Sequence, residues 1–432
     1  MRFPFFAHMA GIGLAMFVQA TPGLAAGLAD ELKALLQSHD RIATAKEQLA
    51  AAGERVDESY SILYPNLSST AFVGREDRRN PNADDTILTG REVNLTLTQR
   101  LYDFGASEAT IDTSKLRQQQ ARAILRQVEE QVLLEALAAY LDIARTSAVV
   151  DFAEESAANI RNQTELENSR FQKGGGFSTD VLQAQTQLVG AEARLVAAKG
   201  DYELAENRFV AVFGYLPMEK PNGDNINISP DVLPVDVDEA IAIAREESSR
   251  LIVARFEEEV SKQAALGTEA DVSLPNLDIV GEQIWSNNVD GVQGFRGESV
   301  VRLQMTYDID FGLTLRNTIK AAEADFRATQ RAYADAVDLV DREVRDAWVQ
   351  LQTVKQSADL LDRQADLAEQ FLELARKERN AGRRSLIDVL AGETALINAQ
   401  SDAISARLNV KVASLGLLAA MGVLDLTSIG EQ

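Results

Sequence analysis

The chain has 432 residues, no cysteine and two histidines, and its formal net charge is −23. The lack of cysteine excludes disulfides, thiolate metal sites, cysteine nucleophiles and a lipid anchor on an N-terminal cysteine. His8 lies in an apparent leader, so His39 alone is left for zinc binding or catalysis, and neither a metal nor a cofactor is expected. The negative charge argues against nucleic acid, because nothing here would neutralise phosphates. Abundant Ala, Gln, Glu and Leu favour a helical, non-enzymatic protein of about two or three domains.

The first 26 residues have the pattern of a secretory signal peptide. Arg2 precedes an apolar run from Phe3 to Val18, and a stretch of small residues follows it. We expect cleavage after Ala26, with Ala25 and Ala29 as alternatives, because the apolar run is too short for a comfortable membrane span. No later segment offers the roughly 18 apolar residues of a spanning helix, so an exported protein without a transmembrane helix is predicted.

The mature sequence consists of two similar halves. Four short motifs each recur 207 to 210 positions further along the chain. The pairs are Pro65-Asn66-Leu67 with Pro275-Asn276-Leu277, Asp103-Phe104-Gly105 with Asp310-Phe311-Gly312, Asp180-Val181-Leu182 with Asp388-Val389-Leu390, and Phe213-Gly214 with Met421-Gly422. Because each half is much longer than a solenoid unit, we expect a duplication of one large unit.

The expected organisation follows from this duplication. The predicted boundaries are a signal peptide at 1–26, a first repeat at 27–214, a linker at 215–237, a second repeat at 238–422 and a tail at 423–432. Each repeat begins with a helix. The first continues with a strand pair at about 64–103, a long helix at 105–172 and a helix at 180–213. The second continues with a strand pair at about 275–310, a long helix at 312–381 and a helix at 388–420.

Both long helices carry an apolar stripe with a period of 3.5 residues. In the second half it runs in steps of four and three from Tyr333 to Ala375, and in the first half from Leu125 to Ile160. This period predicts left-handed coiled-coil packing, although the stripes alone would also suit a soluble helical bundle. At 1.5 Å per residue each long helix would reach about 100 Å, which is several times the width of an ordinary domain.

The segments between the helices alternate with a period of two. Apolar side chains from Val93 to Leu101 and from Val301 to Ile309 alternate with polar or charged ones. About ten residues of such alternation suit a tilted membrane-spanning strand, and an amphipathic surface sheet is the alternative. The connecting segments 74–91 and 286–299 are polar and rich in Gly, Asn and Asp, as expected for extracellular loops.

Four strands cannot close a barrel by themselves, because about eight are the practical minimum. An open sheet edge is excluded inside a membrane, where no water satisfies the backbone. Strands must therefore be pooled between two, three or four copies, and the pattern alone does not choose among these numbers.

Three features of the sequence occur twice: Pro-Asn-Leu before a strand, Asp-Phe-Gly before a long helix, and the break from Gly174 to Leu182 and from Gly382 to Leu390. In these features the chain resembles the TolC family of outer-membrane exit ducts. The resemblance covers essentially the whole mature chain. It implies a mainly α fold with a membrane β-barrel contribution: a homotrimer whose 12 strands form one barrel continued by a periplasmic helical tunnel.

The resemblance also implies a function and partners. The family acts as a passive duct for type I secretion or multidrug efflux, in contact with a periplasmic adaptor, an inner-membrane transporter and outer-membrane lipid. Many drug-efflux relatives are lipoproteins with an N-terminal cysteine, so a chain without cysteine favours the secretion-type branch.

In the family, acidic rings and polar links at the periplasmic turns hold the tunnel shut. The resemblance places the first constricting carboxylate at Asp388, whereas the second ring would fall at Ala391 and is missing. A gate-locking contact would join Arg384 to Thr179 and Asp180. A tyrosine common in that network would fall at Arg379. Without the resemblance, the two acids read simply as helix-starting residues, which favour the positive end of a helix by about 0.3–1 kcal/mol.

Two other classes of protein share some of these features. A periplasmic coiled-coil adaptor or scaffold would share the export signal and the long helices, but it would not require amphipathic strand pairs. An enzyme is disfavoured, because the chain has no phosphate loop ending in Gly-Lys-Ser/Thr, no metal-ligand cluster and no Gly-x-Ser-x-Gly elbow. The run Gly174-Gly175-Gly176 suits a tight turn between helices.

Overall fold

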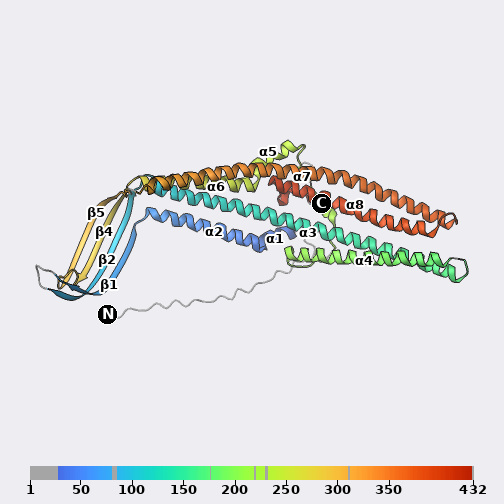
Figure 1. Cartoon of the computed structure of the whole chain (residues 1–432), viewed down its shortest axis with the longest axis horizontal. Coiled ribbons are helices and arrows are strands. Elements are labelled where there is room, and N and C mark those ends of the chain that lie inside the picture. The colour runs from blue at the N-terminus through green and yellow to red at the C-terminus, as the bar shows by residue number, and fades with distance from the viewer. Residues whose placement is uncertain are drawn as a thin grey trace.

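A computed structural model describes residues 28–79, 85–175, 177–217, 220–228, 232–309 and 312–430. The chain forms an elongated molecule, with the long strands together at one end and two helix–helix turns at the other (Figure 1). The expected leader 1–26, Gly176 and the second Asp310-Phe311 lie outside the described residues.

The two halves repeat one order of elements, which confirms the mainly helical, duplicated fold. The first half contains α1 (Leu28–Ser38), α2 (Asp40–Tyr60), β1 (Asn66–Arg78), β2 (Thr86–Tyr102), α3 (Ala106–Gln172) and α4 (Ser178–Phe213). The second contains α5 (Val237–Glu247), α6 (Ser249–Ser273), β4 (Asn276–Asn287), β5 (Phe295–Thr306), α7 (Thr314–Asn380) and α8 (Leu386–Met421). The two-residue strands β3 (Asn227–Ile228) and β6 (Ile429–Gly430) pair with each other. The long helices α3 and α7 have 67 residues each, and α4 and α8 have 36 each.

The four long strands form one antiparallel sheet in the order β1-β2-β4-β5. The two halves of the chain therefore meet between β2 and β4. The strands β1 and β5 are the outer strands, and each has one edge without a partner in the described chain.

The register gives this sheet two chemically different faces, because residues directly opposite each other point to the same side. One side, here the apolar face, carries these exposed side chains: Leu67, Val73, Ile87, Val93, Leu97, Ile279, Trp285, Phe295, Val301, Leu303 and Met305. The other side, here the polar face, carries Thr70, Asn94, Thr96, Thr98, Arg100, Asp278, Glu282, Arg302 and Gln304, with Phe72 as an exposed apolar exception. Arg302 binds Glu282 on the polar face through two nitrogen–oxygen contacts of 2.7 Å. The sheet is thus amphipathic as the alternation predicts.

The strands extend further into the connecting segments than the sequence suggests. Parts of the segments expected as loops at 74–91 and 286–299 belong to strands, because Arg78 of β1 pairs with Thr86 of β2 and only 288–294 separate β4 from β5. At the other end, β5 stops at Thr306, although the alternation predicts a strand up to Ile309. A ladder of backbone hydrogen bonds does not require apolar side chains, so charged residues extend the strands.

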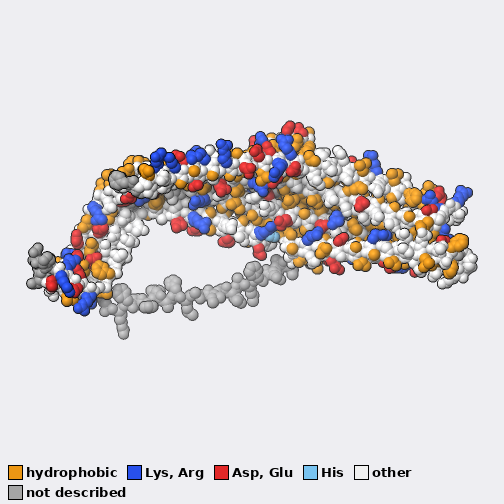
Figure 2. Space-filling view, in the orientation of Figure 1, with side chains coloured by type: hydrophobic (Ala, Val, Ile, Leu, Met, Phe, Trp, Pro, Cys, Tyr) orange, Lys and Arg blue, Asp and Glu red, His pale blue; other side chains and the backbone are white. Residues whose placement is uncertain are grey.

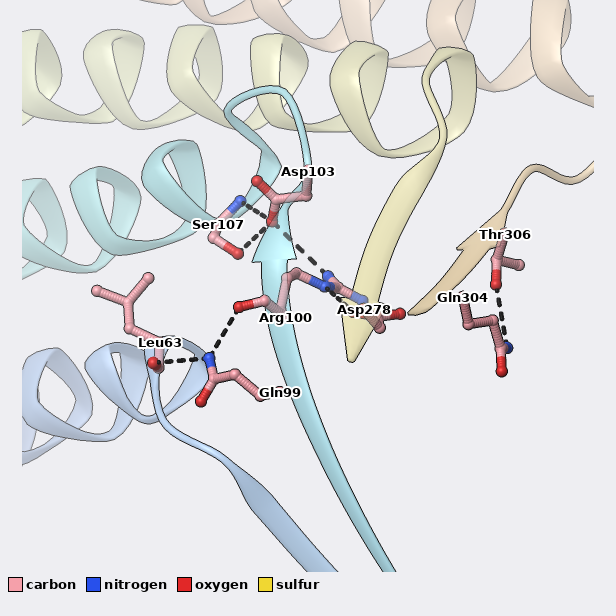
Figure 3. A network of polar contacts seen from close by, with 8 residues as sticks. All are labelled: Leu63, Gln99, Arg100, Asp103, Ser107, Asp278, Gln304 and Thr306. Atoms are coloured by element: carbon pink, nitrogen blue, oxygen red, sulfur yellow. Dashed lines mark hydrogen bonds and ion pairs between the residues drawn. The ribbon is translucent and has the colours of Figure 1, made fainter. Parts of the chain in front are cut away.

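A polar network holds the junction between the sheet and the helices (Figure 3). The Asp103 Oδ2 atom accepts hydrogen bonds from the backbone N–H, at 2.9 Å, and the hydroxyl of Ser107 in the first turn of α3. The Arg100 guanidinium lies 3.7 Å from Asp103 and 3.4 Å from Asp278 of β4. Gly105 has φ +97°, a conformation that favours glycine, so the motif Asp-Phe-Gly makes a capped corner between strand and helix.

The helical core follows the predicted stripes. On α7 the buried positions are Val340, Val344, Leu351, Ala358, Leu372 and Ala375, and α3 buries Val132, Ala136, Ala139, Ile143, Ala157 and Ile160. The expectation that no segment after the leader is apolar enough to cross a membrane is wrong, because α8 is long and apolar enough to do so. Its apolar residues pack in the core instead, since Leu415, Leu417, Leu418 and Met421 are fully buried.

A partly buried carboxylate, that of Glu130, lies where α3 passes the break between α5 and α6. The Glu130 Oε1 atom accepts hydrogen bonds from the Ser249 hydroxyl at 2.8 Å and from Arg126 Nε at 3.0 Å. Arg126 also donates to the carbonyl oxygen of Gly422 at 2.8 Å and lies 3.3 Å from Glu247, so it links α3 to the ends of α8 and α5. Burial raises the pKa of Glu130, against the lowering effect of Ser249 and Arg126.

Glu130→Gln is therefore expected to be more stable than the parent at pH 7. A folded-state pKa above the unfolded value stabilises the protein at pH values below the unfolded pKa, and this contribution is lost as pH rises through the folded pKa. The amide oxygen can still accept both hydrogen bonds, which meet on one oxygen. Guanidinium unfolding at pH 7 and at about pH 4 measures the difference, which should shrink at the lower pH. Exposed Glu155→Gln is the control, and lower stability of Glu130→Gln at pH 7 would contradict the prediction.

Candidate functional site

The two helix–helix turns lie together at the end of the molecule opposite the sheet (Figure 1). They join α3 to α4 and α7 to α8, and we call this region the hairpin end. Gly174 (φ +80°) and Gly382 (φ +71°) each occupy the left-handed conformation just after a long helix. Their amide groups donate to the carbonyl oxygens of Phe171 and Arg379, both at 2.9 Å. Glycine suits these positions because a Cβ atom is strained there, so both are helix-ending turns.

The two hairpins contact each other through a small apolar cluster. Leu386 and Leu390 at the start of α8 pack with Ile160 of α3 and with Ala184 and Ala191 of α4. These contacts place the two turns side by side, so polar groups near them can interact across the hairpins.

A buried ion pair joins the hairpins next to this cluster. The carboxylate of Glu167 on α3 is 6% exposed, and its Oε1 atom lies 2.8 Å from Arg379 Nη2 at the end of α7. Arg170, one turn further along α3, lies 3.4 Å from the other carboxylate oxygen. Arg379 also donates to the carbonyl oxygen of Arg384 at 3.3 Å. Arg379 thus connects α3 with the α7–α8 turn, at the position where the family resemblance suggests a tyrosine.

Arg384 contacts two residues of α7, which belongs to the same hairpin as Arg384 itself. Its Nε atom lies 3.0 Å from Glu378 Oε2, and its guanidinium lies over the ring of Phe371, 5.1 Å from the centroid. Within the described residues, no hydrogen bond or ion pair joins Arg384 to Thr179 or Asp180. The predicted contact between these residues therefore stays a prediction, which a neighbouring copy would have to complete.

Asp180 instead lies near Arg379. Both line a crevice of about 60 Å³ between the hairpins, together with Ser385 and Leu390. Thr179 is exposed in the first turn of α4. Within one chain, Asp180 therefore shares this crevice with Arg379 and not with Arg384.

Asp388 lies in the first turn of α8 and is exposed. Its backbone N–H donates to the hydroxyl of Ser385, which caps the helix, at 3.4 Å. In the described part of the chain its carboxylate has no hydrogen-bond or ion-pair partner. The carboxylate is therefore free to face an aqueous space.

Two buried carboxylates were not predicted from the sequence. Glu167 and Glu393 are both buried, and Glu393 pairs with Arg376. A signal for Glu167 was present, because this residue continues the buried steps of four and three through Ile160 and Thr164. A carboxylate at a stripe position requires a cationic partner, since an unpaired buried charge is costly.

In the described residues no group of three or more His, Asp or Glu side chains could hold a metal ion. His39 caps α2, where its Nδ1 atom accepts a hydrogen bond from the backbone N–H of Arg41 at 3.2 Å. The hairpin end is suited to holding helices together and to presenting charge.

Comparison with known proteins identifies the same duplicated unit elsewhere. A family model described as outer membrane efflux protein matches residues 32–215 and 240–423. Outer membrane efflux protein BepC of Brucella suis is 26% identical over 389 residues, covering 88% of this chain and 81% of the relative. Outer membrane protein TolC of Vibrio cholerae is 23% identical over 425 residues, covering 95% of this chain and 95% of the relative. The crystal structure of the outer membrane protein VceC of Vibrio cholerae has the same fold, with a TM-score of 0.77 at 18% identity over 91% of this chain and 95% of that one.

Proposed function

The chain belongs to the outer membrane efflux protein family, and from this premise we propose that it is the exit duct of a tripartite export system. It is an outer-membrane channel protein of the efflux or type I secretion kind and not an enzyme, with a large helical part in the periplasm. The observation that carries the proposal is the four-stranded sheet, which has one apolar face and two unpaired edges. Such a sheet is compatible with a membrane only when neighbouring copies pair its edges.

We propose that three copies pool their strands into one barrel of 12. Four strands are too few to close, and β1 of one copy can pair with β5 of the next. The family resemblance favours three copies over two or four. In this barrel the apolar face contacts lipid and the polar face lines the lumen, as in other outer-membrane barrels.

Exposed stripes on the helices support assembly with further copies. Leu182, Val189 and Val196 on α4 lie seven residues apart, and their side chains are 63–71% exposed. Leu360, Leu367 and Leu374 on α7 have the same spacing and are 56–65% exposed. A heptad spacing of apolar residues is typical of a coiled-coil seam, and the buried stripes of the same helices already serve the core within one chain. We infer that these outer stripes pack between copies and continue the barrel as a helical tunnel.

The duct is passive, and its partners supply energy and cargo. The sequence has no nucleotide-binding loop, so transport is driven by an inner-membrane transporter of the ATP-binding cassette or another class, connected through a periplasmic adaptor.

We propose that the hairpin end is the periplasmic gate. Three copies would bring three Asp388 carboxylates around a narrow axis, where like charges repel each other and attract cations. The free, exposed carboxylate of Asp388 supports this role, and Asp180, Thr179 and Arg384 would contribute to closure between copies. Gly174 and Gly382 set the turns that carry these residues.

Single-channel conductance of the purified protein in a planar bilayer tests the duct and its gate. We expect discrete, long-lived steps that are selective for cations and blocked by trivalent cations. Asp388→Asn should reduce both selectivity and block, because it removes the ring of charge, whereas Asp402→Asn, in the middle of the same helix, should leave both unchanged. Unaltered selectivity and block in Asp388→Asn would contradict the assignment.

The alternative function, a periplasmic coiled-coil adaptor without a channel, makes a different prediction. Such a protein would not insert into a bilayer and would fractionate with soluble periplasmic material. Recovery of the mature chain in the outer-membrane fraction, together with conductance steps, would exclude that alternative.

A further inference from the structure

The loop between β4 and β5 folds back over the polar face of the sheet, at the end far from the helices. We call residues 288–294 the mouth loop. A Cβ atom added to Gly90 of β2 would lie 3.0 Å from the backbone oxygen of Asn288 and 3.2 Å from Val289 Cγ2. Gly90 belongs to the polar face, so the mouth loop lies on that face, and a side chain at this position would push against the loop.

The solvent exposure of residues at the start of β2 also indicates that the mouth loop covers the polar face. Gly90 is buried and Leu88 is half-buried on the polar face, whereas Ile87 and Thr89 on the apolar face are exposed. In an uncovered sheet of four strands both faces would be open to solvent. The mouth loop therefore shields one face only.

Charged residues of the polar face hold the mouth loop through Asp290. Arg78 Nη1 donates to the Asp290 carbonyl oxygen at 2.8 Å, and Arg78 Nη2 lies 3.0 Å from its carboxylate. The Asp290 N–H donates to Glu76 Oε2 at 3.1 Å, and Arg296 lies 3.6 Å from the carboxylate. Acidic and basic side chains accordingly gather at this end of the sheet (Figure 2). The loop thus reaches from β4 across β2 to β1.

The mouth loop has a defined but weakly held conformation. Its backbone closes on itself through the Asn288 N–H to the Gly294 oxygen at 3.1 Å and through the Gly294 N–H to Asn288 Oδ1 at 2.8 Å. The side chains of Arg78 and Asp290 are 46% and 59% exposed, so their ion pair contributes little by itself. A loop held in this way can open without disturbing the strands.

Resting on the proposed function, in which the polar face lines the lumen, we propose that the mouth loop narrows the outer opening of the duct and that Gly90 and Asp290 set the size of solute that passes. A layer of chain packed on a sheet face stands up to about 10 Å from it, and each copy would add one such layer inside the rim. Gly90 lets the backbone of the mouth loop approach the sheet closely, and Asp290 binds the loop to Arg78 and Glu76.

The chain offers a matched steric test. Gly90→Val places a bulky side chain against the mouth loop, whereas Gly74→Val alters its direct partner on β1, on the same face, where an added Cβ atom meets nothing within 4 Å. Valine favours strands, so neither change should prevent folding. Asp290→Asn removes the negative charge that binds Arg78 and Arg296 while keeping the shape of the side chain.

Because the chain has no cysteine, a single introduced cysteine can report access to the lumen. Thr96→Cys lies on the polar face and Leu97→Cys on the apolar face. Intact cells with the channel in the outer membrane are treated from outside with a small charged maleimide or with a bulky polyethylene-glycol maleimide. In the parent we expect the small reagent to label Thr96→Cys and the bulky reagent to be excluded.

Gly90→Val should speed labelling of Thr96→Cys by the bulky reagent by about tenfold, because a side chain forced against the mouth loop shifts the open population by about that factor. Asp290→Asn should speed this labelling by about twofold, because the ion pair that it weakens is exposed to solvent. Gly74→Val should have no effect. Equal labelling by the bulky reagent in the parent and in Gly90→Val, or equal effects of Gly74→Val and Gly90→Val, would overturn the proposal. If the small reagent labels Leu97→Cys and does not label Thr96→Cys, then the polar face does not line the lumen. In that case the proposed function is wrong, and the mouth loop has not been the cause.

Discussion

Arg379→Gln is expected to destabilise the hairpin end by about 3 kcal/mol, because it leaves the buried carboxylate of Glu167 without its nearest partner. The effect should stay near the lower end of the range for broken buried ion pairs, since Arg170 remains 3.4 Å away. Weaker attachment between the hairpins should also raise the resting conductance of the channel. Guanidinium unfolding of the purified protein and single-channel recording measure the two effects.

Arg384→Gln is the matched control for this prediction. Its partner Glu378 has a side chain that is 38% exposed, so solvent screens the loss and the change in stability should stay below about 1 kcal/mol. The double variant Glu167→Gln/Arg379→Gln should recover part of the lost stability, because it removes the unpaired charge. If Arg379→Gln and Arg384→Gln behave alike, Glu167 does not depend on Arg379.

Val301→Arg is expected to prevent stable insertion of the protein into the outer membrane. Val301 lies on the apolar face in the middle of β5 and is 77% exposed in one copy. Arginine on the lipid side of a barrel strand costs about 2–4 kcal/mol near the middle of the bilayer, and every copy in the barrel would carry it. We expect loss of the protein from the outer-membrane fraction and of its resistance to detergent denaturation.

The neighbouring residue provides the control, because Val300→Arg introduces the same side chain on the opposite face. Val300 lies directly opposite Glu282, so the new arginine would find water and a carboxylate. Val300→Arg should insert at nearly the parental level. Equal loss of both variants would show that β5 tolerates arginine on neither face, and the assignment of lipid and lumen faces would be wrong.

The fold was largely readable from the sequence because it depends on long regular periods. The stripe ending at Ala375 on α7 and the alternation around Val93 on β2 extend over many residues, so single exceptions do not obscure them. The membership of the family and the location in the outer membrane followed from the doubled motifs. The extent of the loops was misjudged, since backbone pairing carries charged residues such as Arg78 into a strand.

The candidate site was less predictable, because ion pairs depend on which side chains meet in space. The resemblance pointed to Arg384, but within one chain it is Arg379 that crosses to Glu167, about 200 positions earlier in the sequence. Glu167 stood at a buried stripe position, which signals a need for a partner without naming it. The roles of Asp388, Thr179 and Asp180 depend on neighbouring copies and remain proposals.

The periods, the duplication and the amphipathic strands follow from the order of residues alone, because local geometry converts each spacing into one face of a helix or sheet. The strand order β1-β2-β4-β5, the ion pair of Arg379 with Glu167 and the position of the mouth loop over Gly90 emerge from the folded chain. These features join residues that are distant along the chain. Their energies come from charge and close packing at single points, which leave no periodic trace in a sequence.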